Sequence, residues 1–149
     1  MKMIQHIAFT AIFIASFAIF ATAQEGSQAS LASATAKFGT VAAADGSVKS
    51  AIDAHDLKAA SGMVGKAGSF TGTVTKIYTP KSGSIAIINF DRDYKTALTA
   101  VVKKSNFGKF PDLTKLEGQK VLVTGKFIDF KGATEIDLDS PDNIKIVSK

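Results

Sequence analysis

The sequence predicts an all-β fold class, a small barrel of five strands, and three observations carry this prediction. Residues 120–138 form two alternating apolar and polar runs joined by a Lys131-Gly132 turn. The first run contains Gly125, which has no side chain to pack and so favours a bulge, a sharp bend or a close backbone approach. A similar apolar–Thr–Gly–x–apolar core recurs at residues 70–74. Strands that bend in mid-course are more typical of closed barrels than of flat sheets.

The expected strands follow one another at short spacing along the second half of the chain. Alternation or short apolar runs predict them at residues 70–78, 85–90, 97–102, 121–127 and 135–138, with a final extended piece over 143–147. A change of phase at Ile77-Tyr78 is typical of a bulge. Pro80-Lys-Ser-Gly83 is a turn by composition.

An insert separates the third and fourth expected strands. Phe107, Phe110, Leu113 and Leu116 recur there at three-residue spacing, which predicts a short helical plug for the barrel, interrupted at Pro111. Five strands with a helical insert at this place have the order of an OB-fold, a partly open Greek-key barrel. An SH3-like barrel would also have five short strands, but not this insert.

Four segments are expected along the chain. Residues 1–23 have the layout of a secretory signal peptide: Lys2, an apolar run over 7–20, and small residues before Gln24. Residues 24–46 are rich in Ala, Ser, Gly and Thr and predict a flexible spacer. A short helix is expected over 47–61, and the OB-fold domain over 62–149.

Composition narrows the class of protein further. The chain has no cysteine, which excludes disulfides, thiolate metal sites and a lipid-modified N-terminal cysteine. Residues 62–149 carry fourteen basic and nine acidic side chains, a net charge of +5. A basic surface attracts nucleic acid, anionic lipid or acidic polysaccharide without choosing between them, and a modest positive charge also serves solubility alone.

The segment from Met63 to Val147 resembles the small OB-fold nucleic-acid-binding domains of exported bacterial proteins, which include tRNA-anticodon-binding-like and secreted-nuclease-associated forms. The resemblance rests on the order of short motifs. These are Thr-Gly in the first strand, Lys81-Ser-Gly83, Asn89-Phe90-Asp91 with Tyr94, the 107–116 insert, Leu116-Glu-Gly-Gln-Lys-Val121, Thr124-Gly125, Phe130-Lys-Gly132, Glu135-Ile136 and Ser140-Pro-Asp-Asn-Ile144. The chain departs from that pattern in having no tryptophan, Thr134 where proline is common, and an acidic fifth strand with Asp137 and Asp139.

An OB-fold binds oligonucleotides or oligosaccharides on the face of its second and third strands, flanked by two loops. That mapping gives the candidate nucleic-acid-binding residues Lys76, Tyr78, Lys81, Asn89, Arg92, Tyr94, Lys103, Lys104 and Lys131. The tyrosines would stack on bases, and the basic side chains would follow the phosphates. Two plainer interpretations stay open: Tyr78 caps the barrel, and the lysines are solvated edge charges that prevent strand pairing.

No catalytic residue, metal site or cofactor is expected. His55 is the only histidine after residue 23, and it falls in the expected helix, which leaves no partner for a dyad or a His-based site. A staphylococcal-type nuclease also has a five-stranded barrel but needs a pair of arginines, and this chain has only Arg92. The chain is interpreted as a non-enzyme.

The functional hypothesis is therefore an exported binding module for single-stranded nucleic acid with little sequence preference, periplasmic or extracellular. The alternative is a periplasmic envelope or stress protein of OB-fold type that binds a protein partner, a cation or a glycan. A third possibility is an accessory subunit that positions substrate for a separate nuclease.

Overall fold

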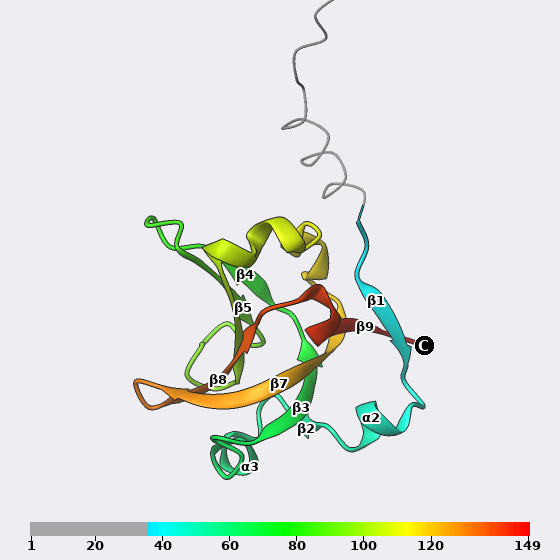
Figure 1. Cartoon of the computed structure of the whole chain (residues 1–149). Coiled ribbons are helices and arrows are strands. Elements are labelled where there is room, and N and C mark those ends of the chain that lie inside the picture. Colours follow the sequence, from blue (N-terminus) through cyan, green and yellow to red (C-terminus); the bar gives the residue numbers. More distant parts are fainter. Residues whose placement is uncertain (1–35) are drawn as a thin grey trace, which may run out of the picture.

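The computed structural model describes residues 36–149, so the expected signal peptide at 1–23 lies outside the described residues, as does most of the expected spacer. Strands dominate the described part (Figure 1). The elements are β1 (Gly39–Ala42), α2 (Gly46–Lys49), β2 (Ile52–Asp53), α3 (Leu57–Ser61), β3 (Ala67–Thr73), β4 (Lys76–Tyr78), β5 (Ile85–Asn89), β6 (Thr99–Lys103), the 3-10 helices η1 (Lys104–Lys109) and η2 (Leu113–Leu116), β7 (Lys120–Phe130), β8 (Ala133–Leu138), the 3-10 helix η3 (Pro141–Asn143) and β9 (Ile144–Ser148).

The strand pairing closes a barrel and confirms the predicted fold class. β3 pairs antiparallel with β7, β4 with β5, and β5 with β6. β6 then pairs parallel with β8, and β8 pairs antiparallel with β7, which returns the sheet to its start. Because β3 and β4 are the two halves of one strand, broken only at Val74 and Thr75, these are the five strands of an OB-fold.

Gly125 lies where β7 changes partners, as the sequence predicted. Residues 120–126 of β7 pair with β3, and residues 127–130 pair with β8, so the strand curves around the barrel (Figure 1). A Cβ atom on Gly125 would lie 2.6 Å from Cγ2 of Ile136. Gly72 is equally constrained, since its Cβ would lie 2.7 Å from Cβ of Ala54. Both glycines therefore mark close approaches across the core.

The N-terminal part of the described chain differs from the expectation. Residues 39–42 of the expected spacer form β1, which pairs parallel with β9, and Phe38 just before it is buried. The single helix expected over 47–61 is two short helices on either side of β2, which pairs parallel with β3. Asp45 and Asp56 cap these helices through their side chains, because a carboxylate at an N-cap accepts the otherwise unpaired backbone N–H groups.

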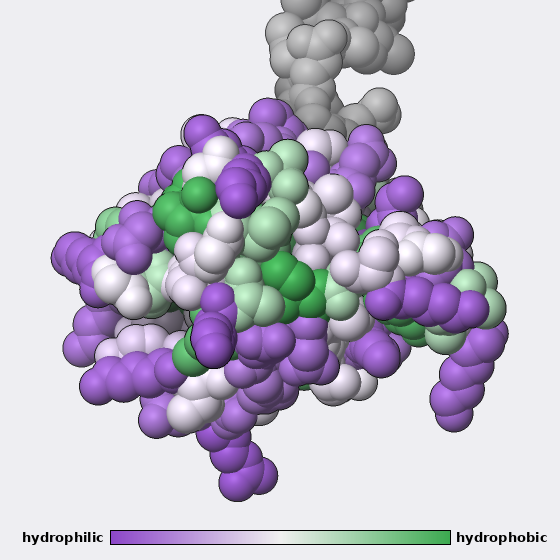
Figure 2. Space-filling view, turned by 90° about the horizontal axis from the view of Figure 1, so that it is seen from below, coloured by the Kyte–Doolittle hydropathy of each residue, from purple (hydrophilic) through white to green (hydrophobic). Residues whose placement is uncertain are grey.

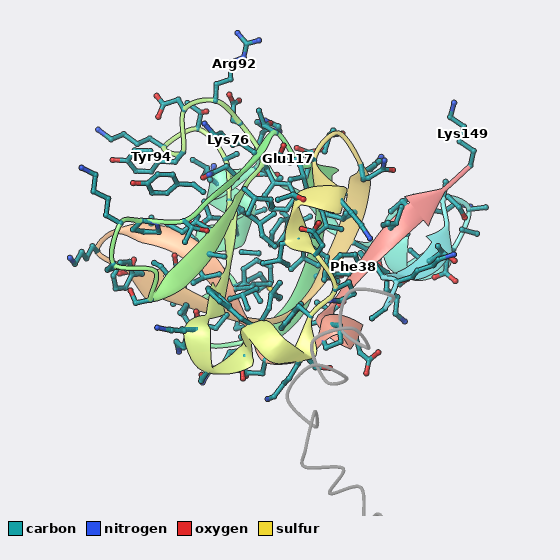
Figure 3. The ribbon with its side chains drawn as sticks, turned by 90° about the horizontal axis from the view of Figure 1, so that it is seen from above. Phe38, Lys76, Arg92, Tyr94, Glu117 and Lys149 are labelled. Atoms are coloured by element: carbon teal, nitrogen blue, oxygen red, sulfur yellow. The ribbon has the colours of Figure 1, made fainter. Side chains whose placement is uncertain are left out.

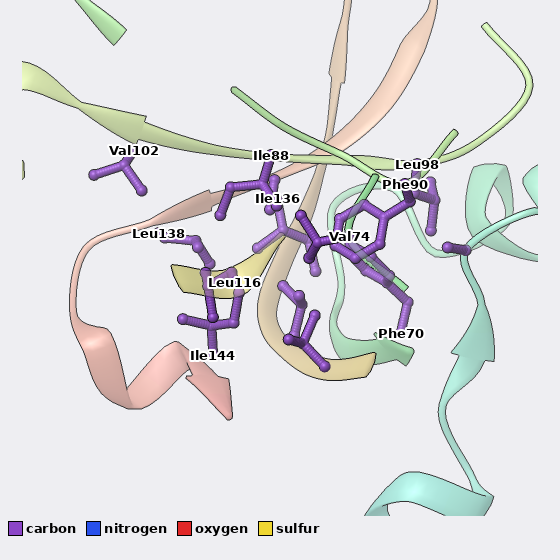
Figure 4. Packing of buried hydrophobic residues seen from close by; sticks show 14 of the residues in the cluster. Phe70, Val74, Ile88, Phe90, Leu98, Val102, Leu116, Ile136, Leu138 and Ile144 are labelled. Carbon is purple, nitrogen blue, oxygen red and sulfur yellow. The ribbon is translucent and has the colours of Figure 1, made fainter. Parts of the chain in front are cut away.

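The core fills the barrel with side chains from every strand of the closed sheet (Figure 4). Phe70, Phe90 and Phe127 pack together, with the rings of Phe70 and Phe90 edge to face at 5.0 Å. The 104–116 insert is helical as predicted, and it places Phe110 and Leu116 in the core as the barrel's plug. The face seen from below carries hydrophilic residues around its edge and a group of hydrophobic residues from its upper left to its centre (Figure 2).

Candidate nucleic-acid interface

One open groove runs over the outer face of the barrel and has a volume of about 1160 Å³. It is built from β4, β5, β6 and β8, the end of β7 and the connection after β5. Seven of the nine sequence-predicted residues line it, namely Lys76, Tyr78, Asn89, Arg92, Tyr94, Lys103 and Lys131. Lys76, Arg92 and Tyr94 lie on one side of the molecule, away from Phe38 and Lys149 (Figure 3).

Lys81 and Lys104 do not line this groove. Lys81 is exposed in the turn between β4 and β5, beyond the end of the paired strands. Lys104 follows Lys103 at the start of η1, and its backbone N–H donates to the carbonyl of Ser84 at 2.9 Å. Since successive residues leave a strand on opposite faces, two adjacent lysines at a strand end do not share one surface.

The floor of the groove contains a polar row that crosses four strands. Lys76 on β4 is in register with Asn89 on β5, Asn89 with Thr99 on β6, and Thr99 with Glu135 on β8. We call these four residues the polar row. In-register residues of neighbouring strands project from the same face, so the row presents two donor groups at its β4–β5 end and a carboxylate at its β8 end.

A second row, offset from the polar row by two residues on each strand, is largely apolar. Tyr78 is in register with Ile87, Ile87 with Val101, and Val101 with Asp137. We call these four residues the apolar row. Ile85, Ile128 and Ala133 extend its apolar surface. This aliphatic floor was not predicted, although the sequences of β5 and β6, which are largely apolar on both faces, were the signal for it.

Three aromatic rings stand at the edge of the groove and are about half exposed. The exposed fraction is 50% for Tyr78, 60% for Tyr94 and 54% for Phe130. Phe130 was not among the predicted site residues. It lies three residues after the buried Phe127 and therefore on the opposite face of β7. This spacing could have predicted an aromatic side chain that points outward at the hairpin. Exposed rings around a groove give flat surfaces on which bases can stack.

The acidic fifth strand faces the groove and changes its electrostatics. The Asp137 carboxylate accepts a hydrogen bond from Nζ of Lys103 at 2.6 Å, and this bond raises the pKa of Lys103. Glu135 is only 9% exposed, and burial, together with the nearby Asp137, raises the pKa of its carboxyl group. The ammonium group of Lys103 is therefore already paired with a carboxylate inside the groove, and we do not include it among the cations that could bind a phosphate.

The remaining cations lie at the rim. Lys76, Arg92 and Lys131 line the groove and are exposed, and within residues 36–149 none of the three belongs to an ion pair. The groove lining holds four basic and three acidic side chains in all, the third acid being Asp91. The interface is thus weakly basic, with its free positive charge at the edge.

Lys131 occupies an unusual backbone conformation. It and Gly132 form the two-residue turn between β7 and β8, with φ angles of 55° and 85°. Positive φ at both positions is the type I′ geometry that matches the twist of a hairpin and favours Asn-Gly. A lysine there costs free energy, and its Nζ lies 5.3 Å from the centre of the Phe130 ring. Such strain is typical of residues kept for function.

His55 differs from its expected surroundings. It lies outside both helices, and its ring nitrogens contact two carboxylates, Nδ1 with Asp53 at 3.1 Å and Nε2 with Asp91 at 3.2 Å. These contacts join the segment before α3 to the connection after β5, which carries Arg92 and Tyr94. Over the described range 36–149, no cluster of three or more histidine, cysteine or acidic side chains is arranged to hold a metal ion. No helix in that range is long and apolar enough to cross a membrane.

The fold is that of an OB-fold barrel whose outer face carries an open groove. Neither a family model nor a curated protein matches the sequence. An aspartyl tRNA synthetase from Entamoeba histolytica is similar in structure with a TM-score of 0.50 at 13% identity, over 76% of this chain and 26% of that chain. The hypothetical protein ygiW from E. coli aligns over 75% of this chain and 99% of its own, at 12% identity and a TM-score of 0.41. The likeness to the synthetase supports the fold, and the chain spans about a quarter of that enzyme.

Proposed function

We propose that the protein is an exported binding module for single-stranded nucleic acid, with little sequence preference along the strand. One observation carries the proposal: Tyr78, Tyr94 and Phe130 expose their rings around a groove whose rim holds unpaired cations. Stacking platforms beside a positive edge are the arrangement that single-strand binding requires. An aspartyl tRNA synthetase is, by its name, a protein that acts on an RNA, which supports the proposal at the level of the fold only.

In this proposal, stacking on the aromatic rings and phosphate contacts with the rim cations make separate contributions to binding. Bases stack on the rings, each contributing about 1–3 kcal/mol, and phosphates pass Lys76, Arg92 and Lys131. With at most three free cations, the logarithm of the binding constant should fall with the logarithm of salt concentration with a slope of about −2, from 0.7 per phosphate contact. Binding is therefore modest in affinity and carried by stacking as much as by charge.

A fluorescence-anisotropy titration against single-stranded DNA and single-stranded RNA at two salt concentrations tests this function. The double variant Tyr78→Ala, Tyr94→Ala should bind about tenfold or more weakly, since two stacking surfaces are lost. Lys76→Gln should weaken binding and reduce the salt slope. Lys104→Gln is the matched control, because Lys104 lies outside the groove. Absence of binding at low salt would exclude the proposal.

A second candidate is binding of a protein partner, a cation or a glycan, as in an envelope or stress protein. The observation that favours it is the aliphatic floor with two carboxylates, Glu135 and Asp137, which weaken the attraction for phosphate. Including a neutral glycan in the same titration separates the two candidates, because the carboxylates do not repel an uncharged ligand. Binding of the glycan with indifference to oligonucleotides would favour the second.

Export and the absence of catalysis belong to the same proposal. The layout of residues 1–23 supports export with cleavage before Gln24, and mass spectrometry of the protein recovered from an expressing bacterium would find a mature chain that starts there. We infer a binding role and no catalysis, since stacking and charge alone account for the groove. An accessory role beside a separate nuclease remains compatible with that binding role.

A further inference from the structure

The two rows of the groove floor have the spacing of a nucleic-acid base. Residues two apart on a strand are about 6.6 Å apart, so a ring that lies over the apolar row brings its hydrogen-bonding edge above the polar row. Tyr78, Ile87 and Val101 supply the flat apolar surface. Asn89, Thr99 and Glu135 then face the edge of the ring. The floor can therefore offer one base hydrogen bonds to its edge as well as a surface on which the base stacks.

The order of groups along the polar row selects among the bases. Lys76 and Asn89 offer N–H donors at one end, and Glu135 offers a carboxylate at the other. The Watson–Crick edge of guanine presents an acceptor, O6, followed by two donors, N1–H and N2–H₂. Thymine and cytosine end their edges with the acceptor O2, and adenine has only one donor group on that edge. Guanine alone places two adjacent donors against a carboxylate.

Of the two carboxylates on the β8 part of the groove, Glu135 has the weaker partner, since it hydrogen-bonds to the Thr99 side chain whereas Asp137 pairs with the charged Lys103. Asp137 is bonded to Lys103 at 2.6 Å, so its carboxylate is engaged. Glu135 sits at the centre of the floor, in register with Thr99 on one side and Ile128 on the other. It is nine-tenths buried among groups that line the groove, where a hydrogen bond to a ligand is little weakened by competing water.

We propose that the polar row forms a guanine-selective subsite in which the Glu135 carboxylate accepts hydrogen bonds from N1–H and N2–H₂. The inference rests on the proposed function, because it assigns one subsite within a groove that otherwise takes any base. Glu135 is here a specificity residue that touches the ligand, and Asn89 is the donor that faces O6.

The test uses the full mature chain and short thymidine oligonucleotides in which one central base is varied. The protein should bind the oligonucleotide with guanine about tenfold more tightly than those with thymine, adenine or cytosine, the range expected for one bidentate pair. Hypoxanthine, which lacks the N2 amino group, should bind with intermediate affinity. A single guanine avoids four-stranded structures in the probe.

The variant Glu135→Gln should lose the preference for guanine over hypoxanthine while it keeps its affinity for the all-thymidine oligonucleotide, which also shows that it is folded. Asp129→Asn is the control, because it removes one negative charge outside the groove lining and its amide oxygen can still accept the Gly132 N–H. Equal affinity for all bases in the wild type would overturn the subsite and leave the proposed function intact. A preference that survives Glu135→Gln would overturn the role of Glu135. Failure to bind any oligonucleotide would overturn both proposals.

Discussion

The two halves of the barrel are specified in different ways. We call β1, β2, β3, β9 and residues 120–126 of β7 the closed half. Tight packing constrains this half, because Gly72 and Gly125 allow backbones and side chains to approach where no Cβ would fit. The open half, made of β4, β5, β6, β8 and residues 127–130 of β7, exposes three aromatic rings, rim cations and carboxylates in a groove. Substitutions in the closed half should therefore change stability, and substitutions in the open half should change binding.

The largest effect is expected in the closed half at Phe38, which joins the core just before β1 and is 7% exposed. Phe38→Ala should lower the free energy of unfolding by about 3–5 kcal/mol, because a large buried ring is lost and a cavity is left. Urea denaturation measures the change, and Thr40→Ala, an exposed position on β1, serves as the control. A variant as stable as the wild type would mean that β1 is not part of the cooperative unit.

The two constrained glycines come next. Gly72→Ala and Gly125→Ala should each destabilise the protein by about 1–3 kcal/mol, since the new Cβ would meet Phe90 and Ala54 in one case and Ile136 in the other. Gly108→Ala is the matched control, because a Cβ there meets nothing within 4 Å. Thermal unfolding of the three variants compares them directly. Equal melting temperatures for Gly72→Ala, Gly125→Ala and Gly108→Ala would contradict the prediction that the closed half has no room for a Cβ atom at these two glycines.

A smaller effect of opposite sign is expected in the open half at Lys131. Lys131→Asn should raise the free energy of unfolding by up to about 1 kcal/mol, because asparagine tolerates the left-handed conformation better. The same change removes one rim cation and should reduce the salt slope of oligonucleotide binding by about 0.7. Lys126→Asn, on the exposed part of β7 outside the groove, controls for the loss of charge. If stability and binding moved in the same direction, the strain at Lys131 would have no connection with function.

The smallest effect is a pH dependence at Glu135. Burial raises the pKa of this carboxyl group above its ordinary value of 4.5, so its contribution to stability is fully present below pH 4.5 and is lost as the pH rises through the raised pKa. Glu135→Gln does not titrate there. The variant should therefore gain stability relative to the wild type between acidic and neutral pH. Denaturation curves at several pH values measure the difference, and a constant difference would show that Glu135 is not buried in solution.

Local patterns predicted most of the closed sheet but only part of the groove. Alternation, the Lys131-Gly132 turn and Gly125 are signals written within a few residues, and they gave the five strands and the bend in β7. β1 was not predictable in this way, because its short run of small residues becomes a strand only by pairing with β9. The split of the expected helix around β2 depends in the same way on pairing with β3.

The candidate site required register as well as sequence. Tyr78, Asn89 and Lys103 were found because the binding face of an OB-fold was mapped onto the expected strands and loops. The polar row was not, since it assembles one residue from each of four strands, and only the pairing shows that Glu135 lies beside Thr99. Lys81 and Lys104 came from the same mapping, which does not fix the direction in which a side chain points at a turn or at the end of a strand.

The pairing of β1 with β9 has a consequence for the order of folding. Ser148 Oγ donates to the carbonyl of Val41 at 3.3 Å across a sequence separation of 107 residues. During synthesis, which proceeds at roughly 5–20 residues per second, β1 is made several seconds before its partner. Contacts so distant in sequence slow folding. β1 therefore cannot pair until β9 has been made, and the nascent chain carries it as an unpaired edge until then.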